Sequence, residues 1–214
     1  MMYVRFPLSL RNVEDLLHER GINICHETVR VWWNRFGPIF AADIRRKRAQ
    51  SMRVFPQWQW HLDEMYVKIR GEIHCLWRAV DHEGEVLEAY VTKMRDRQSA
   101  LRFLRKVMNQ FGAPKIVVTD KLRSNGAATE EIGNADVQET GRWLNNRAEN
   151  SHQPLKRRER AMSRFRRMRS LQKFAAVHTS VLNHFNQDRS LNHRPVFKER
   201  GTAALAEWRQ LCAA

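Results

Sequence analysis

Apolar residues recur at two different spacings along the chain, and the change between them predicts where domains begin. Residues 10–17 and 25–36 repeat apolar side chains every three or four positions, which is typical of amphipathic helices. Ser9 can cap the first helix and Gly21 can end it. Two short helices joined by a glycine-containing turn predict a helix-turn-helix over residues 1–40, with residues 26–36 as its second helix. A plain helical hairpin would give the same pattern.

Residues 41–57 are basic, show no clear period and end near Pro56, so we interpret them as a linker. From residue 58 the apolar spacing changes to two. The runs 58–69, 74–80 and 86–92, separated by turns, predict a three-stranded antiparallel meander. A helix is expected over residues 96–111 and a short buried strand over residues 115–119.

A further strand is expected near residues 135–139, and a long helical pattern runs onward from Asn145. This order predicts an α/β domain over residues 58–190, with a mixed five-stranded sheet and flanking helices. Residues 191–214 are expected to form a C-terminal tail. Only eight residues precede the first helix, so a third supporting helix is missing or supplied from elsewhere, and truncation of the chain stays open.

Charge is distributed unevenly, which indicates the kind of partner. The net charge of the chain is +15, and residues 142–200 hold 15 Lys/Arg against 4 Asp/Glu. Residues 156–169 alone hold eight basic residues and one acidic residue. A solvated helix face does not need this density of positive charge, whereas a polyanion such as the phosphate backbone of nucleic acid would match it.

Composition excludes several other classes of protein. No run approaches 18 consecutive apolar residues, so no membrane span is expected, and the first residues lack the features of a signal peptide. Three cysteines, an odd number in no metal-type spacing, indicate free thiols in a reducing cytoplasm. A zinc site at Cys25-His26 or His74-Cys75 would need partners that the sequence does not place.

Three acidic residues stand out against this basic background. Asp63 is in phase with the inward face of its strand, and Asp120 directly follows a short apolar strand. A buried carboxylate needs a cation or dedicated hydrogen bonds. Glu149 opens the basic helix, seven residues before Lys156, so both project from one helix face. Carboxylate oxygens favour Mg²⁺ or Mn²⁺, and two such ions could serve phosphoryl transfer.

These segments carry motifs that resemble a known family. The motifs are WHLDE at 60–64, WRAVD at 77–81, VTDK at 118–121, LNNRAENSH at 144–152 and KRRER at 156–160. Residues 58–174 resemble the catalytic core of DDE transposases, which have a ribonuclease-H-like fold, and more narrowly the transposases of the insertion-sequence 6 family. The helix-turn-helix at 9–37 resembles the family's reader of DNA ends more loosely.

The resemblance implies that Asp63, Asp120 and Glu149 are the catalytic, metal-binding triad, with two Mg²⁺ or Mn²⁺ ions. It implies that Lys156 lies close to the DNA strand. The implied activity is binding of terminal inverted repeats, strand cleavage and strand transfer. The implied partners are double-stranded DNA at element ends and target, and a homodimer or higher synaptic assembly; no small-molecule substrate is implied. We expect a bacterial cytoplasmic protein associated with the nucleoid.

DNA contacts are expected from two regions. Arg30 and Asn34 are candidates for base contacts in the major groove. The basic helix supplies phosphate-contact candidates, which are Lys156, Arg157, Arg160 and Arg164. For the adjacent tryptophans Trp32 and Trp33, packing within the small domain is the alternative to a DNA contact, and we favour packing for Trp32.

Two other functions remain open from the sequence. A non-catalytic DNA-binding protein, such as a repressor or an inactive transposase remnant, explains the charge and the helix-turn-helix, but not the two acids on apolar strand faces. A ribonuclease-H-like nuclease acting on RNA–DNA hybrids shares the carboxylates. The adjoining DNA reader makes the nuclease the weaker alternative.

Overall fold

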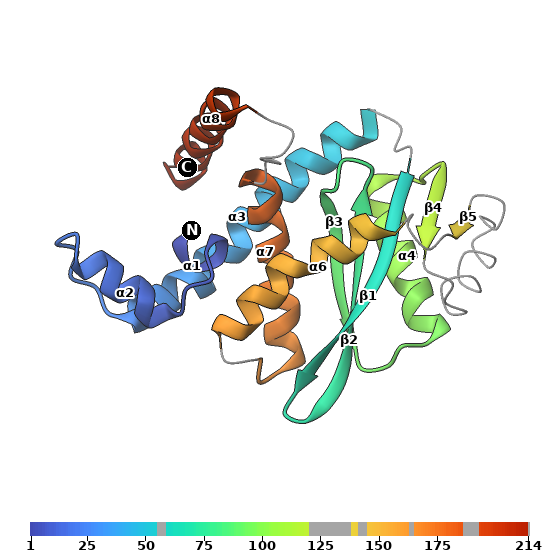
Figure 1. The fold of residues 1–214 in the computed structure, drawn as a ribbon, viewed down its shortest axis with the longest axis horizontal. Helices are drawn as coiled ribbons and strands as arrows, with labels where there is room; N and C mark the ends of the chain where they lie inside the picture. Colours follow the sequence, from blue (N-terminus) through green and yellow to red (C-terminus); the bar gives the residue numbers. More distant parts are fainter. Residues whose placement is uncertain (55–58, 120–137, 141–144, 163–164, 186–192, 214) are drawn as a thin grey trace.

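The chain folds around a five-stranded mixed sheet, seen in the computed structural model (Figure 1). The structure describes residues 1–54, 59–119, 138–140, 145–162, 165–185 and 193–213. The strands are β1 (Gln59–Ile69), β2 (Glu72–Asp81), β3 (Val86–Thr92), β4 (Ile116–Thr119) and β5 (Gln138–Thr140). The helices are α1 (Met2–Arg5), α2 (Leu10–His18), α3 (His26–Val54), α4 (Arg97–Phe111), α6 (Asn146–Ala161), α7 (Met168–Phe185) and α8 (Arg194–Ala213).

The strand order is β3-β2-β1-β4-β5. Strands β1, β2 and β3 pair antiparallel as the predicted meander, while β4 pairs parallel with β1 and β5 pairs parallel with β4. Arg70 and Gly71, both with positive φ, close the hairpin between β1 and β2 in the way that a two-residue turn of this twist requires. The predicted fold class is therefore confirmed: an α/β fold with a mixed five-stranded sheet and flanking helices.

Helices cover both faces of the sheet, and each face has its own core. On one face α4 packs on Trp60, Leu62 and Trp77. Asp96 caps α4 through the backbone N–H of Ser99 and Gly112 ends it, so the helix predicted over residues 96–111 is confirmed.

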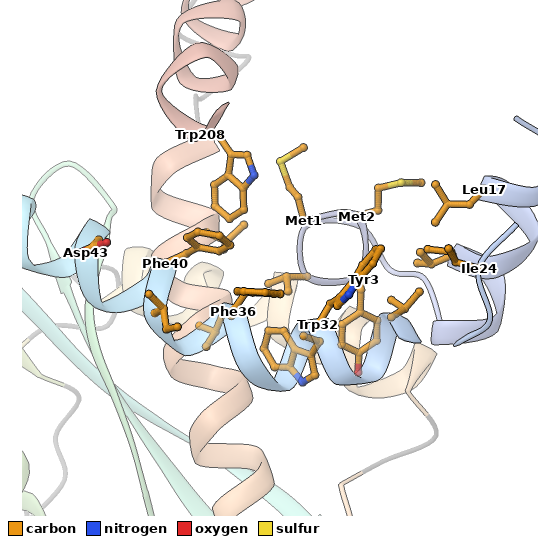
Figure 2. A pocket seen from close by; sticks show the side chains of 18 residues that line it. Met1, Met2, Tyr3, Leu17, Ile24, Trp32, Phe36, Phe40, Asp43 and Trp208 are labelled. Carbon is orange, nitrogen blue, oxygen red and sulfur yellow. The ribbon is translucent and has the colours of Figure 1, made fainter. Parts of the chain in front are cut away.

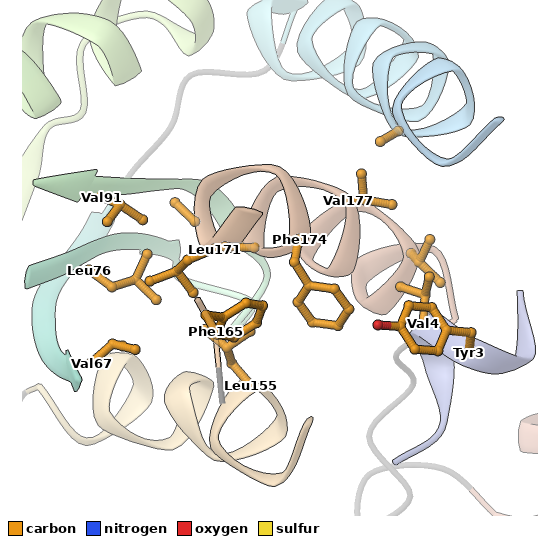
Figure 3. Close-up of a cluster of buried hydrophobic side chains, with 14 of the residues drawn as sticks. Tyr3, Val4, Val67, Leu76, Val91, Leu155, Phe165, Leu171, Phe174 and Val177 are labelled. Atoms are coloured by element: carbon orange, nitrogen blue, oxygen red, sulfur yellow. The ribbon is translucent and has the colours of Figure 1, made fainter. Parts of the chain in front are cut away.

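On the other face α6 and α7 cover Val67 and Leu76, and the same cluster continues through Phe174 to Tyr3 near the N-terminus (Figure 3). The N-terminal helices and the sheet domain therefore share one apolar core.

Helix α3 differs from the prediction. The interpretation of residues 41–57 as a linker is wrong for residues 41–54, because one continuous helix runs from His26 to Val54. Ala41 and Ile44 are buried, and Arg48 reaches the far end of β2, where its guanidinium lies 2.8 Å from an oxygen of Asp81. The helical period was hard to see in the sequence because Arg48, a basic residue, points inward where an apolar residue would be expected.

A proline within α3 explains one contact between the N-terminal region and α7. Pro38 has no N–H to donate to the carbonyl of Asn34, four residues earlier. Lys173 of α7 donates to that carbonyl instead, at 3.0 Å, and to the Asn34 side-chain oxygen at 2.8 Å. A helix can therefore continue through Pro38 because α7 satisfies the carbonyl that the proline leaves open.

The two ends of the chain also gain structure that the sequence pattern did not predict. Most of the expected C-terminal tail forms α8, whose Trp208 packs on Phe40 with ring centroids 5.3 Å apart. Residues 2–5 form the short helix α1, and its Tyr3 and Val4 are buried. None of the helices in the described ranges is long and apolar enough to cross a membrane.

Candidate active site

Asp63 lies in β1, on the face of the sheet that α6 and α7 cover. Met65, Val67 and Ile69 follow it in phase and are buried, as strand periodicity predicted. Asp63 itself is at the edge of this core, and its side chain is 12% exposed. Its carboxylate is therefore held by protein on one side and open to solvent on the other.

The parallel pairing of β1 and β4 bears on the second predicted carboxylate. The register pairs Leu62 with Thr119, and these are the residues directly before Asp63 and Asp120 in the sequence. Asp120 itself lies outside the described residues, so its predicted position next to Asp63 stays a prediction.

Helix α6 brings Glu149 to the same side of the sheet. Glu149 is exposed in the first turn of α6, where the positive end of the helix dipole favours a carboxylate. His152, one turn further on, is buried, and its Nε2 donates to Oδ2 of Asp63 at 3.0 Å. Because residues three or four apart share a helix face, Glu149, His152 and Lys156 form one stripe, and its centre contacts Asp63.

Arg78 lies directly across from Asp63, on β2. It is 1% exposed, and its Nη1 donates to the backbone carbonyl of Ser151 in α6. Burial lowers the pKa of Arg78 to about 10, and the nearby charge of Asp63 opposes that shift. The guanidinium remains charged at neutral pH, so a buried cation faces Asp63.

The pKa of His152 is lowered, chiefly because burial disfavours the imidazolium. The hydrogen bond to Asp63 acts in the opposite direction, and the charges of Arg78 and Lys156 lower the pKa further. His152 is therefore neutral at physiological pH. Since a carboxylate can only accept, Nε2 carries the proton in this tautomer.

The predicted phosphate-contact residues follow α6. Lys156, Arg157 and Arg160 are exposed along the helix. Arg164 lies outside the described residues. Their neighbour Arg158 turns inward instead and donates to the carbonyls of Leu8 and Tyr3. One helix thus carries the predicted catalytic glutamate and three exposed cations, and also contacts the N-terminal segment.

The two residues predicted to contact DNA bases, Arg30 and Asn34, differ in the contacts that their side chains make within the protein. Arg30 is exposed and pairs with Glu27 at 3.1 Å. Asn34 is also exposed, but its side-chain oxygen already accepts from Lys173 of α7. Of the two candidates, Arg30 is the one whose side chain is not engaged by the sheet domain.

A large apolar hollow lies among the N-terminal helices, with a volume of about 800 Å³ (Figure 2). Trp32 lines it and is 49% exposed, so the expectation that Trp32 packs inside the small domain is wrong. Trp33 is the packed residue, with its ring centroid 5.6 Å from that of Phe174. A Cβ at position 37 would lie 2.9 Å from the ring of Trp33, so Gly37 leaves room for that ring.

Sequence reasoning missed His152, Arg78 and Asn145 as members of the site. Two signals were available: His152 follows Glu149 by three residues, and Arg78 is in phase with the buried Leu76 in an otherwise apolar strand. Asn145, whose Nδ2 donates to the carbonyl of Leu62 in β1 at 2.8 Å, carried no such signal. Its role depends on the docking of α6 against β1.

Oxygen ligands dominate the open side of the site. Within the part of the chain that the structure describes, no group of three His, Cys, Asp or Glu side chains is placed to hold a metal ion. Asp63 and Glu149 are the described carboxylates of the predicted triad; the first is partly buried and the second is exposed. Such donors fit a hard divalent cation better than zinc, which prefers thiolate or imidazole.

Comparison with known proteins places the chain in a family. Residues 57–188 match the family model described as a DDE domain. The transposase for the insertion sequence-like element IS431mec of Staphylococcus aureus strain Mu50 is 35% identical over 162 residues, covering 73% of this chain and 70% of that protein. The transposase for insertion sequence element IS257 in transposon Tn4003 of Staphylococcus aureus is 34% identical with the same coverage. The chain belongs to the DDE transposases of the insertion-sequence 6 family.

Solved structures with a similar chain path are retroviral integrase cores. The catalytic core domain of BIV integrase is 15% identical, covers 71% of this chain and 99% of its own, and has a TM-score of 0.47. The HTLV-2 integrase catalytic core domain in complex with magnesium, in its trimeric form, is 15% identical, covers 66% of this chain and 96% of its own, and has a TM-score of 0.46.

Proposed function

We propose that this transposase binds the terminal inverted repeats of its element and cuts and joins DNA by metal-dependent phosphoryl transfer. One observation carries the proposal: His152 of α6 hydrogen-bonds Asp63 of β1, which sets the helix that bears Glu149 beside the strand that bears Asp63. Membership of the DDE transposases supports the same assignment.

Asp63, Asp120 and Glu149 are the proposed metal ligands. Two bound Mg²⁺ or Mn²⁺ ions, roughly 3.5–4 Å apart, would activate the attacking oxygen and stabilise the leaving oxygen. The protein contributes the orientation of the ligands: Asp63 is held by His152, and Glu149 projects from the first turn of a helix fixed to the sheet.

The proposed chemistry balances without a covalent protein intermediate. In cleavage, an oxygen of water attacks the phosphorus of a phosphodiester and the bond to the 3′ oxygen breaks, which leaves a 3′-hydroxyl and a 5′-phosphate. In joining, that 3′-hydroxyl attacks a target phosphodiester, a new P–O bond forms, and the target's own 3′ oxygen leaves with a proton. Each step exchanges one ester bond for another bond at phosphorus.

The exposed cations of α6 are the proposed contacts to the phosphate backbone. Lys156 shares the helix face of Glu149, so a strand bound there would run past the carboxylates. Arg157 and Arg160 extend the positive surface, and we include Arg164 with them. Such contacts release counterions, so binding should weaken steeply as salt rises.

The N-terminal helices are the proposed reader of the element ends. Arg30 is the stronger base-contact candidate, and Asn34 keeps only its amide N–H groups for DNA because its oxygen accepts from Lys173. A homodimer or higher assembly would hold two ends together. We place the protein with the nucleoid of a bacterial cytoplasm, where its DNA substrate lies.

The proposal is tested by strand transfer from a donor that carries the element's own ends. We expect joined product with Mg²⁺ or Mn²⁺ and none with chelator. Asp63→Asn should reduce joining by roughly 10²–10³-fold or more, because removal of one charge weakens stabilisation of the transition state. Binding of end DNA by the same variant, measured by gel shift at fixed salt, should stay within a few-fold of wild type.

A matched control separates the proposed site from the general charge of the chain. Glu159→Gln removes a carboxylate from the same helix ten residues after Glu149, and should join DNA like the wild type. Tight, salt-dependent binding of end DNA with no metal-dependent nicking by the wild type would instead support the non-catalytic DNA-binding protein. Cleavage restricted to RNA–DNA hybrids would support the nuclease.

A further inference from the structure

Three buried side chains connect the first turns of α6 to strands β1 and β2. They are Asn145, which is 4% exposed, His152, which is 2% exposed, and Arg78, which is 1% exposed. Each donates a hydrogen bond across the gap between helix and sheet. All three contacts fall close to the two described carboxylates, Asp63 and Glu149.

Asn145 holds the start of the helix. It occupies the N-cap position of α6, where an asparagine side chain usually accepts from the helix's own N–H groups. Here it makes no such cap and its Nδ2 donates instead to the carbonyl of Leu62 at 2.8 Å. The acceptor is the residue directly before Asp63, so this hydrogen bond fixes where the start of α6 lies along β1.

Arg78 holds the middle of the same segment. Its Nη1 donates to the carbonyl of Ser151, between Glu149 and His152 in the order of the helix. Pro154 lies in the next turn and supplies no N–H to the carbonyl of Asn150, the residue directly before Ser151. Burying a guanidinium is costly, and an apolar side chain of similar volume would often pack at least as well. The charge of Asp63, directly across on β1, offsets part of this cost.

His152 holds the carboxylate itself. The ring is buried and donates from Nε2 to Oδ2 of Asp63, so it restricts how that carboxylate can rotate. A neutral imidazole does this without adding a positive charge, which would compete with a cation for the same oxygens. Groups that orient metal ligands in this way typically change metal affinity or activity by 10–100-fold when they are removed.

We infer that His152 is a positioning residue for the metal-binding carboxylate of Asp63, and that Arg78 and Asn145 support it by fixing α6 against the sheet. This inference rests on the proposed function for its catalytic meaning, but the orientation of Asp63 can be measured without catalysis. His152 contacts Asp63, the proposed metal ligand, and not the reacting atoms. It acts through Asp63.

Three substitutions at position 152 separate orientation from packing. His152→Gln places an amide N–H where Nε2 stands, so it can still donate to Asp63. His152→Asn carries the same amide, but its shorter side chain places that group where Nδ1 stands, away from the carboxylate. His152→Leu removes the donor altogether. As a control, His178→Leu makes the same change at another buried histidine, on α7, whose ring stacks on Phe174.

The first measurement is binding of Mn²⁺ alone to the full chain, followed by electron paramagnetic resonance, with circular dichroism to confirm folding of each variant. We expect affinity for Mn²⁺ to fall about tenfold or more in His152→Leu and His152→Asn. His152→Gln should stay within about threefold of wild type, and so should His178→Leu even if it melts at a lower temperature. Equal affinity in the asparagine and glutamine variants would overturn the inference, as would absence of Mn²⁺ binding by the wild type.

The second measurement is strand transfer as a function of Mg²⁺ concentration. We expect the half-saturating Mg²⁺ concentration to rise about tenfold in His152→Leu and to recover in His152→Gln. If the wild type binds Mn²⁺ in a His152-dependent way but joins no DNA, the proposed function fails and the positioning role stands. If every variant joins DNA with the wild-type metal dependence, the function stands and the positioning role is wrong.

Discussion

At the scale of single residues, the site consists of Asp63 with Arg78 directly across from it and His152 hydrogen-bonded to it. Arg78 faces Asp63 from β2, while His152 and His178 are both buried with lowered pKa values. Asp63 thus lies across from one buried cation and accepts a hydrogen bond from one neutral ring.

His178 makes one consequence of this environment measurable. Burial, with the charges of Arg78 and Arg158, lowers its pKa to about 3, against about 6.5 in an unfolded chain. Below pH 6.5 the unfolded chain binds a proton that the folded chain does not. Stability is therefore lost as the pH falls from about 6.5 towards 3, by up to about 1.4 kcal/mol per pH unit from this group.

The substitution His178→Phe tests this effect, because it keeps a ring on Phe174 but cannot titrate. Urea unfolding at pH 7, 6, 5 and 4.5 should show a steeper loss of unfolding free energy in the wild type than in the variant. Parallel curves for the two proteins would show that His178 does not carry the expected pKa shift.

Sequence periodicity predicted the residue positions that depend on one element alone. The two-residue period of the strand placed Asp63 on its inward face, and the helical period placed Glu149 and Lys156 on one helix face. The partners of these residues come from other elements: His152 meets Asp63 only when α6 docks on β1, and Arg78 meets Ser151 only when α6 lies over β2. A single-element period contains no information about such docking.

At the scale of elements, α6 carries Glu149 and contacts both the sheet and the N-terminal segment. One face carries Glu149 and His152 towards β1, while Arg157 and Arg160 point to solvent. Arg158 points to the N-terminal segment, where it donates to the carbonyl of Leu8 at 2.9 Å and to that of Tyr3. The helix that holds the proposed catalytic glutamate is therefore tied to the region proposed to read DNA ends.

Arg158→Met should loosen that connection. The substitution keeps the buried stem but leaves two carbonyls without their donor, and each unsatisfied buried group costs about 1–3 kcal/mol. Because the buried charge is also removed, we expect a net loss of about 2–4 kcal/mol in unfolding free energy, measured by urea denaturation. Hydrogen exchange should show faster exchange in residues 1–9.

Arg157→Met is the matched control. The side chain of Arg157 is exposed, so its loss should change the unfolding free energy by less than about 0.5 kcal/mol. If the two variants were equally stable, the contact of Arg158 with the N-terminal segment would not contribute to the fold.

Some elements could be predicted from the sequence pattern, and others could not. The meander, α4 and the turn at Arg70-Gly71 were predicted because their signals are local. Helix α3 was predicted too short, since its continuation past Pro38 is stabilised by contacts that have no local signature: Arg48 with Asp81, and Lys173 with the carbonyl that Pro38 leaves open.

At the scale of the whole molecule, a single apolar core runs from the sheet to the N-terminal helices (Figure 3). Tyr3 contacts Trp33 and Phe174, which lie on α3 and α7. The regions proposed for end recognition and for catalysis are therefore parts of one packed body, and DNA bound at the N-terminal helices would have a fixed geometry relative to α6. This arrangement follows from packing between distant segments, and the sequence pattern predicted only its separate parts.

The central claim is that Asp63 and Glu149, from a strand and a helix distant in sequence, act together as ligands of the same metal site. The most direct test is a double-mutant cycle of strand transfer with Asp63→Asn, Glu149→Gln and the double variant, in saturating Mn²⁺. Residues that act as one unit are non-additive, so we expect the double variant to be no slower than the slower single variant. A double variant whose loss equals the product of the two single losses would contradict the claim, because the two carboxylates would then contribute independently.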